Sequence, residues 1–219
     1  MKKTILSVLV IGAMLSSCTN NGNKASTTAA KEVVVSYSEM AEDYNLISDE
    51  SHVNWRASHL GGVQPRYGKI ALKSAKVIVS NLTLTNASIL IDMSAISVES
   101  FPEGADEIAK LQGHLQSPDF FNVAQYSTSK FELTSVLDVE GDYTSLLTGN
   151  LTILEVTKSI TFNANVSIEN GSVSVKSEDF SIDRRDWGLS YNTEGTAGVP
   201  VDYLIANDIG FTIDITLTK

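Results

Sequence analysis

Hydrophobic and polar residues alternate most regularly between Gly149 and Ile168. The apolar residues of the second half of this stretch share one parity: Ile160, Phe162, Ala164, Val166 and Ile168. Side chains alternate between the two faces of a strand, so this half predicts a strand with one apolar face. The first half alternates as well, and only Glu155–Lys158 separates the two halves. The whole stretch therefore predicts an antiparallel hairpin whose apolar face needs a partner.

The same period of two recurs along much of the chain. It marks further strands near residues 51–57, 68–80, 84–96, 131–139, 173–182 and 209–217, with turn residues such as Asn170–Gly171 between them. About eight strands joined by turns are typical of an antiparallel sandwich or barrel. Closing the strands into one sheet removes the exposed edges, so we predict an all-β fold with a single antiparallel barrel.

Residues 101–126 interrupt this pattern. Pro102 and acidic residues after it suit the start of a helix, and Ile108, Leu111 and Leu115 have helical spacing. Pro118 stops the segment, because proline cannot continue a helix. We predict one short helix within a long loop, followed by Phe120 and Phe121, which must be buried.

The alternation alone does not say whether the apolar face points inward. A transmembrane barrel would turn it outward, but aromatic residues are only 7% of the chain, too few for two interfacial girdles. An inward apolar face either forms a filled core or lines a cavity, because an eight-stranded barrel is just wide enough for either. The small residues Ala87, Ala95 and Ala164 leave some room, and both alternatives stay open.

The N-terminus has the form of a secretory signal. Lys2 and Lys3 precede an apolar run, Ile5–Leu15, that is too short to span a bilayer as a helix. Leu15–Cys18 resembles the lipobox of bacterial lipoproteins, in which the cysteine is acylated; ordinary cleavage nearby is the alternative. Cys18 is the only cysteine, so no internal disulfide can form. We expect a signal peptide over 1–17, a flexible tether over 18–32 and one domain over 33–219.

The net charge of the chain limits the kinds of molecule that it can bind. The net charge is -10, so a basic field for nucleic acid is excluded and anionic lipid would not attract the surface. An acyl group on Cys18 would instead provide attachment to a membrane. Without an acidic run after the cysteine, we expect a lipid-anchored protein of the bacterial cell envelope that faces the periplasm.

Catalytic and metal-binding patterns are sparse. The three histidines show no H-x-H or H-x-x-x-H spacing, and no G-x-S-x-G, P-loop or dinucleotide fingerprint occurs. We therefore expect no catalysis, no metal and no cofactor. One polar segment remains, Arg184–Trp187, at the end of a predicted strand. Its arginines beside Trp187 suit a lipid headgroup at a cavity mouth; the alternative is an Arg–Asp ion pair, with Trp187 capping the barrel.

Several motifs, in order, resemble the YceI-like family of lipid- and polyisoprenoid-binding proteins. They are S-H-V-N-W from Ser51, H-L-Q-S-P-D-F-F from His114, G-N-L-T-I with V-T-K from Gly149, and F-S-I-D-R with D-W-G from Phe180. The resemblance covers about residues 44–219. It departs at Gln112–Gly113, where many members carry Arg-Asp, and at Glu155, where a small residue is usual.

This resemblance implies a lipocalin-like antiparallel barrel holding a long isoprenoid-type lipid in its interior. The protein would sequester or transport that lipid; the alternative is a structural or stress-related lipoprotein with a filled core that binds other envelope proteins. We expect Arg184 and Trp187 at the cavity mouth. The apolar parities supply the expected lining: Trp55, Ile89, Ile91, Met93, Phe131, Leu133, Leu151, Ile153, Ile160, Phe162, Ala164, Val166, Phe180, Ile182, Phe211 and Ile213.

Overall fold

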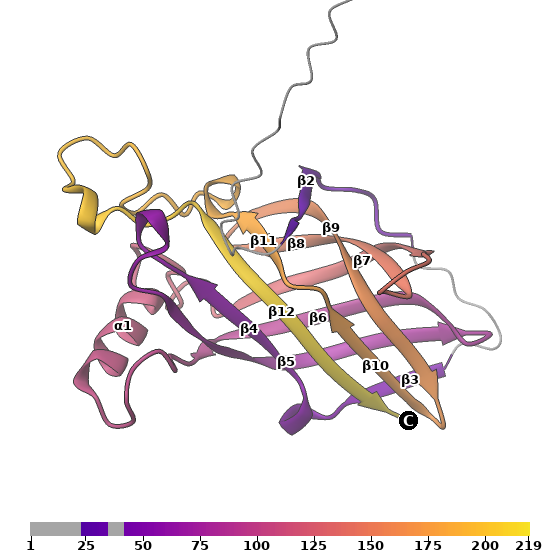
Figure 1. Cartoon of the computed structure of the whole chain (residues 1–219). Helices are drawn as coiled ribbons and strands as arrows, with labels where there is room; N and C mark the ends of the chain where they lie inside the picture. Colours follow the sequence, from indigo (N-terminus) through magenta and orange to yellow (C-terminus); the bar gives the residue numbers. More distant parts are fainter. Residues whose placement is uncertain (1–22, 35–41) are drawn as a thin grey trace, which may run out of the picture.

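The computed structural model describes residues 23–34 and 42–219, which are mostly β-strand (Figure 1). The helical elements are η1 (Ser48–Glu50), η2 (Leu60–Gly62), α1 (Asp106–Gln116), η3 (Arg184–Trp187) and η4 (Val201–Tyr203). The strands are β1 (Asn23–Lys24), β2 (Ser26–Ala29), β3 (Glu42–Leu46), β4 (His52–Ala57), β5 (Arg66–Ser80), β6 (Thr83–Ile96), β7 (Thr128–Asp138), β8 (Ser145–Ile153), β9 (Val156–Glu169), β10 (Ser172–Ser177), β11 (Phe180–Asp183) and β12 (Asp208–Thr218). The predicted signal peptide and Cys18 lie outside the described residues.

Eight strands of the described chain close into a ring. Their order is β4, β5, β6, β7, β8, β9, β10 and β12, and β12 pairs back to β4; each neighbouring pair is antiparallel. The strand β11 follows β10 along the same partner, β12. The predicted fold is therefore confirmed: an all-β antiparallel barrel with one short α-helix in a long loop.

The hairpin that shows the clearest alternation is β8–β9. Ile153 pairs with Val156, so Leu154 and Glu155 form the turn and β9 begins earlier than predicted. Leu154 adopts a positive φ of 54°. At the other end of β9, Asn170 and Gly171 have φ values of 52° and 76°. Positive φ at both central residues defines the type I′ turn that an Asn-Gly pair predicts.

Bulges change the parity of some strands, which the sequence pattern does not reveal. In β7 the register with β8 shifts between Leu133 and Ser135. Beyond that shift, Val136 packs against the core and Leu137 is 57% exposed. The period of two over residues 131–139 predicts that Leu137 shares the inward face of Phe131 and Leu133. This prediction is wrong, because one extra residue turns the rest of a strand over.

The helix α1 and the segment after it cover one end of the barrel (Figure 1). Leu115 is buried there with Trp55, Ile70 and Met93, and Phe120 and Phe121 pack against the same cluster. The predicted helical spacing places Ile108 and Leu111 on this cluster as well. No helix in the described part of the chain is long and apolar enough to cross a membrane.

Residues 23–29 of the N-terminal segment pair with strands of the barrel. The strand β1 pairs in parallel with β11, and β2 pairs with β9 over residues 158–161, where β10 no longer covers that strand. Ala25 is buried between them. The tether expected over residues 18–32 is therefore wrong for 23–29, and the folded unit begins before residue 33. Short polar residues made this segment look like a linker, although backbone pairing at two strand edges fixes it.

Candidate functional site

Three small apolar cavities lie in a row inside the described barrel. Cavity 1, of about 70 Å³, lies between cavity 2, of about 60 Å³, and cavity 3, of about 40 Å³. Ile91 and Phe131 line both cavities 1 and 2. Ile70 and Phe211 line both cavities 1 and 3. The row therefore follows the barrel interior to the end covered by α1.

Most of the predicted lining residues border this row. Around cavity 1 lie Ile91, Met93, Phe131, Leu151, Ile153, Ile160, Phe180, Phe211 and Ile213. Around cavity 2 lie Ile89, Leu133 and Phe162 in addition to Ile91, Phe131 and Ile213. Trp55 borders cavity 3, where its indole N–H donates to the Ser97 carbonyl at 3.0 Å.

Three predicted lining residues border none of these cavities. Ala164 and Ile182 are fully buried in the surrounding core, and Val166 packs against that core from a partly buried position. Their inward parity was correctly predicted. These three residues pack within the core instead, because a barrel has more inward-facing residues than can border a narrow row of cavities.

Other lining residues were not predicted. Phe121 borders cavities 1 and 3, and Ile70, Leu72 and Leu84 border the row from β5 and β6. Between β5 and β6 the register shifts after Ile70 and again after Leu72. The inward parity of β5 therefore changes after Leu72, so that Ile70 and Leu72 lie on the other parity from Val77 and Val79. One feature of the sequence indicated that the α1 segment contributes to the lining: Phe120 and Phe121 have to be buried.

Four phenylalanine rings form a row of ring contacts beside the cavities. The ring of Phe162 stacks on Phe180, with centroids 4.6 Å apart and an interplanar angle of 6°. Phe131 contacts Phe162 at 5.9 Å, and Phe211 contacts Phe180 at 6.0 Å. Gly149 makes room for this row, because a Cβ at that position would lie 2.2 Å from the Phe131 ring. The glycine of the motif thus has a packing role.

The cavity volumes limit what the interior can hold in the described conformation. An engineered apolar cavity of about 150 Å³ is large enough for benzene, and drug-sized ligands occupy pockets of roughly 300 Å³ or more. Each of the three cavities is smaller than either. A long apolar chain would therefore fit only if side chains such as Met93 and Phe162 moved aside, so that the separate cavities merged into one space.

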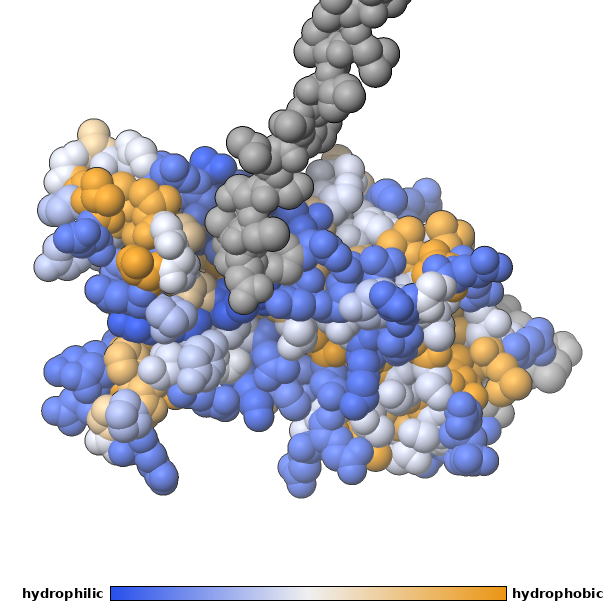
Figure 2. All heavy atoms as spheres, viewed as in Figure 1, coloured by the Kyte–Doolittle hydropathy of each residue, from blue (hydrophilic) through white to orange (hydrophobic). Residues whose placement is uncertain are grey.

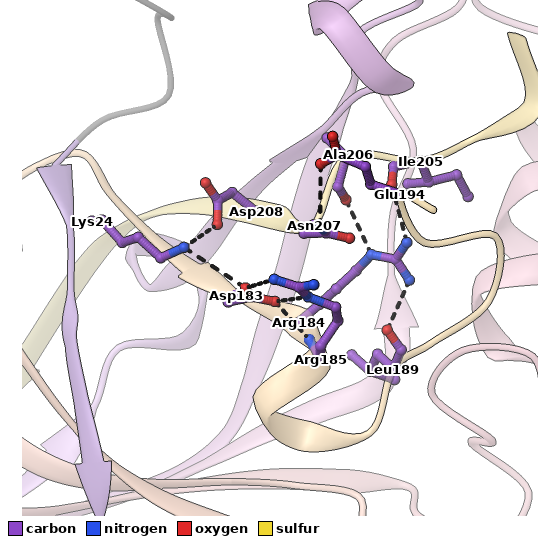
Figure 3. A network of polar contacts seen from close by, with 10 residues as sticks. All are labelled: Lys24, Asp183, Arg184, Arg185, Leu189, Glu194, Ile205, Ala206, Asn207 and Asp208. Carbon is purple, nitrogen blue, oxygen red and sulfur yellow. Dashed lines mark hydrogen bonds and ion pairs between the residues drawn. The ribbon is translucent and has the colours of Figure 1, made fainter. Parts of the chain in front are cut away.

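Arg184 is the charged side chain nearest to this row. It is 1% exposed and borders cavity 3. The guanidinium donates to the carbonyls of Ala206 at 3.1 Å, Leu189 at 2.8 Å and Ile205 at 3.2 Å (Figure 3). Burial lowers the pKa of Arg184 to about 10, with Asp183 opposing this shift. Arg184 therefore fastens the loop before β12 to the barrel.

Arg184 and Trp187 do not lie at an open mouth, as the sequence suggested. Trp187 is fully buried, and its indole N–H donates to the Leu151 carbonyl at 3.0 Å. Arg184 is turned toward backbone carbonyls, which take up the hydrogen bonds that a headgroup was expected to receive. Both residues are therefore structural in this conformation, and their prediction as mouth residues is wrong.

The Arg–Asp ion pair of the alternative interpretation is present, with Arg185 as the cation. Asp183 accepts from Arg185 Nε at 2.9 Å and from Nη2 at 2.6 Å. These bonds hold the pKa of Asp183 below its usual range, although partial burial opposes the shift. Lys24 of β1 contacts Asp208 at 2.8 Å and Asp183 at 3.8 Å. The network thus ties β1 to β11 and β12 (Figure 3).

Histidine and carboxylate groups do not gather elsewhere in the described chain. No three His, Cys, Asp or Glu side chains of residues 23–34 and 42–219 are placed to hold a metal ion. His114 contacts Asp119 at 3.1 Å and packs against Phe120 and Tyr191. The three rings of His114, Phe120 and Tyr191 join the α1 segment to the loop before β12.

Sequence comparison identifies similar proteins over most of the domain. The YceI-like domain matches residues 44–217. A UPF0312 protein of Pseudomonas putida strain F1 is 33% identical over 138 residues, which are 59% of this chain and 65% of that protein. The chain thus spans just under two thirds of that relative. A UPF0312 protein of Ectopseudomonas mendocina is 29% identical over 174 residues, covering 70% of this chain and 83% of the relative.

Two solved structures have a similar fold. Burkholderia cenocepacia BcnA matches with a TM-score of 0.58 at 15% identity, covering 77% of this chain and 96% of its own. A polyisoprenoid binding domain from Saccharophagus degradans, implicated in plant cell wall breakdown, matches with a TM-score of 0.57 at 15% identity. That match covers 80% of this chain and 97% of that domain. At such low identity the likeness shows a shared fold.

Proposed function

This chain belongs to the YceI-like family, and we propose that it binds a long apolar, polyisoprenoid-like lipid inside its barrel. The observation that carries the proposal is the row of adjoining apolar cavities along the interior. An interior that is apolar apart from Ser129 and the buried Arg184 at one end suits a ligand that consists of hydrocarbon. The Saccharophagus degradans domain of similar fold supports this ligand class, since it is named for polyisoprenoid binding.

The role that we propose is sequestration or transport, without catalysis. Apart from Ser129, with no histidine or carboxylate beside it in the described lining, the cavities are bordered by aliphatic and aromatic side chains, and the nearest charged group, Arg184, is engaged by three carbonyls. General acid–base or nucleophilic chemistry needs a titratable group within reach of the ligand. The interior offers shape and hydrophobicity, which suit binding.

We further propose that the protein is an envelope lipoprotein that faces the periplasm, anchored by an acyl group on Cys18. The support comes from the leader sequence and from the single cysteine that follows its apolar run. Radiolabelled palmitate should label the wild-type chain, and Cys18→Ala should lose the label. Equal labelling of both chains would contradict the anchor.

A second candidate function is favoured by the cavity volumes. A barrel whose largest cavity in the row is about 70 Å³ is close to filled, as a structural or stress-related lipoprotein that binds other envelope proteins would be. Extraction of the purified protein with chloroform and methanol separates the two candidates. Long-chain lipid in a fixed ratio to protein supports binding; its absence favours the filled barrel.

A further inference from the structure

The first described residue of the chain is already fixed to the barrel. Asn23 donates through its side-chain amide to the buried carboxylate of Glu178 at 2.8 Å. The Ala25 amide donates to the Ser181 carbonyl at 2.8 Å, and Lys24 pairs with Asp208. The described part of the domain therefore reaches back at least to Asn23, and residues 23–29 are held on the barrel rather than forming a tether.

This starting point shortens the distance to the proposed anchor. Four residues lie between Cys18 and Asn23, and the five Cα–Cα steps that join the two span at most about 18 Å when fully extended. A tether that continued to residue 33 would reach about 54 Å. An acyl group on Cys18 would therefore hold β1, and the end of the barrel near it, close to the bilayer surface.

Two loops stand beside β1 at that end of the barrel. Residues 58–66 and 194–206, which we call the loop tip, are joined by hydrogen bonds from Leu60 N to Leu204 O at 2.8 Å and from Ala206 N to Ser58 O at 3.0 Å. A groove of about 880 Å³ runs between them and β1, with Lys24, Gly61 and Glu194 among its walls. The loop tip and the start of the ordered chain thus border one surface.

The loop tip exposes apolar and aromatic side chains. Val63 is 54% exposed, Val201 68% and Tyr203 63%; Tyr67, which follows the first loop, is 49% exposed. Figure 2 shows apolar surface gathered on the protruding loop before β12, drawn in yellow in Figure 1. Exposed apolar groups that gather on one protrusion mark an interaction site. Tyrosine suits the interface between lipid and water, because its ring is apolar and its hydroxyl is polar.

We propose that the loop tip docks onto the lipid bilayer that carries the Cys18 anchor. The inference rests on the proposed anchor, since the short connection is what brings this end to the membrane. The groove carries both signs of charge, from Lys24 and Arg185 and from Asp183 and Asp208. That mixture, in a chain of net charge -10, suits zwitterionic phospholipid headgroups rather than an anionic surface.

Docking in this orientation would turn cavity 3 toward the membrane. Ile205 of the loop tip borders cavity 3, and Ala57 borders both that cavity and the groove. Arg184 links the same loop to the barrel through the carbonyls of Ile205 and Ala206. A lipid that left the bilayer at the loop tip would thus meet the apolar row at its nearer end.

The test measures contact between single positions and the bilayer. Cys18 is the only cysteine, so in protein produced without acylation its free thiol can be coupled to a maleimide-bearing phospholipid, which anchors the chain at that residue. The vesicles contain phosphatidylcholine and phosphatidylethanolamine, with or without brominated acyl chains that quench tryptophan. One variant carries Tyr203→Trp. The matched control carries Leu137→Trp, at a position of similar exposure, 57%, at the opposite end of the barrel.

The two native tryptophans contribute little to the quenched signal, because Trp55 is 5% exposed and Trp187 is fully buried. We expect brominated lipid to remove most of the added fluorescence of the Tyr203→Trp chain and little of that of the control. The loss should persist in 0.5 M salt (roughly 4 Å of screening length), since apolar contact is not screened. Val201→Ser together with Val63→Ser should reduce the quenching.

Equal quenching at both positions, or quenching at neither in vesicle-bound protein, would overturn docking by the loop tip. Because the anchor is chemical, neither result depends on acylation in cells, which the palmitate label tests separately. Lipid bound inside the barrel is measured by extraction, so failure of the carrier function is also distinguishable from failure of docking.

Discussion

Phe162 of β9 stacks face to face on Phe180 of β11, with ring centroids 4.6 Å apart. Phe162 borders cavity 2 and Phe180 borders cavity 1, so the stacked pair stands between the two spaces. A lipid chain that occupied both cavities would have to displace at least one of these rings. The stack therefore decides whether the interior behaves as a filled core or as a binding site.

Replacing Phe162 with alanine should open the interior. We expect the free energy of unfolding in urea to fall by about 3–5 kcal/mol, as for other large-to-small substitutions in a core. The barrel should also bind more N-phenyl-1-naphthylamine, because cavities 1 and 2 would merge. Val166→Ala, on the same strand but away from the cavities, should leave dye binding unchanged. Equal dye binding by wild type and Phe162→Ala would show that the ring does not separate the cavities.

Arg184 should contribute more to stability than its neighbour Arg185. Arg184→Met removes three hydrogen bonds and leaves buried carbonyls without a donor, so we expect a loss of about 3 kcal/mol in unfolding free energy. The loop before β12 should become sensitive to proteases. Arg185→Met breaks a pair whose arginine is 51% exposed, so its loss should stay within about 1 kcal/mol. Similar losses in the two variants would contradict the fastening role.

Acid should weaken the network around Asp183. Arg185 holds the pKa of Asp183 below its usual range, so the folded state favours the ionised carboxylate. The resulting stability is fully present above the pKa of about 3.9 of an unfolded aspartate and is lost as pH falls through the folded value. The melting temperature of Asp183→Asn should thus lie below that of wild type at pH 6, and this difference should shrink below pH 4. A difference that is independent of pH, or one matched by the exposed-turn control Asp142→Asn, would contradict this account.

The N-terminal segment should be protected from hydrogen exchange. The amide of Ala25 is bonded to the Ser181 carbonyl, and β2 pairs with β9. We expect deuterium uptake over residues 23–29 to be slowed well below the rate of an unfolded peptide. Asn150→Ala, which removes the two bonds between that side chain and Lys31, should speed exchange around residue 31 and leave α1 unchanged. Deuterium uptake at the rate of an unfolded peptide would show that residues 23–29 form a flexible tether after all. Docking by the loop tip would then lose its basis.

The strands and the short helix could be predicted because each depends on local periodicity. The alternation along β9 was enough to predict that Ile160 and Phe162 face inward, without knowing which strands pair with β9. The errors have other causes. Leu137 was misplaced because a bulge depends on the register with the neighbouring strand, and residues 23–29 were misread because their order comes from edges supplied by β9 and β11.

The polar end of the site was the least predictable part. The order Arg184, Arg185, Asp186 does not say which arginine is buried or which aspartate accepts. The fold decides this by placing three carbonyls around Arg184 and leaving Asp183, one position earlier, to pair with Arg185. Cavity volume is likewise invisible in the sequence, since it depends on how four phenylalanine rings from four strands come together.

Native mass spectrometry of the protein purified from membranes in mild detergent tests the central claim most directly. The account predicts a non-covalent lipid adduct in the wild type. Ile91→Trp should lose that adduct, because Ile91 borders cavities 1 and 2 and a larger side chain would fill them, at a cost of about 1–3 kcal/mol in stability. Leu137→Trp, on the outside of the barrel, should keep it. A wild-type spectrum with no adduct, or an adduct that Ile91→Trp retains in full while folded, would contradict binding inside the barrel.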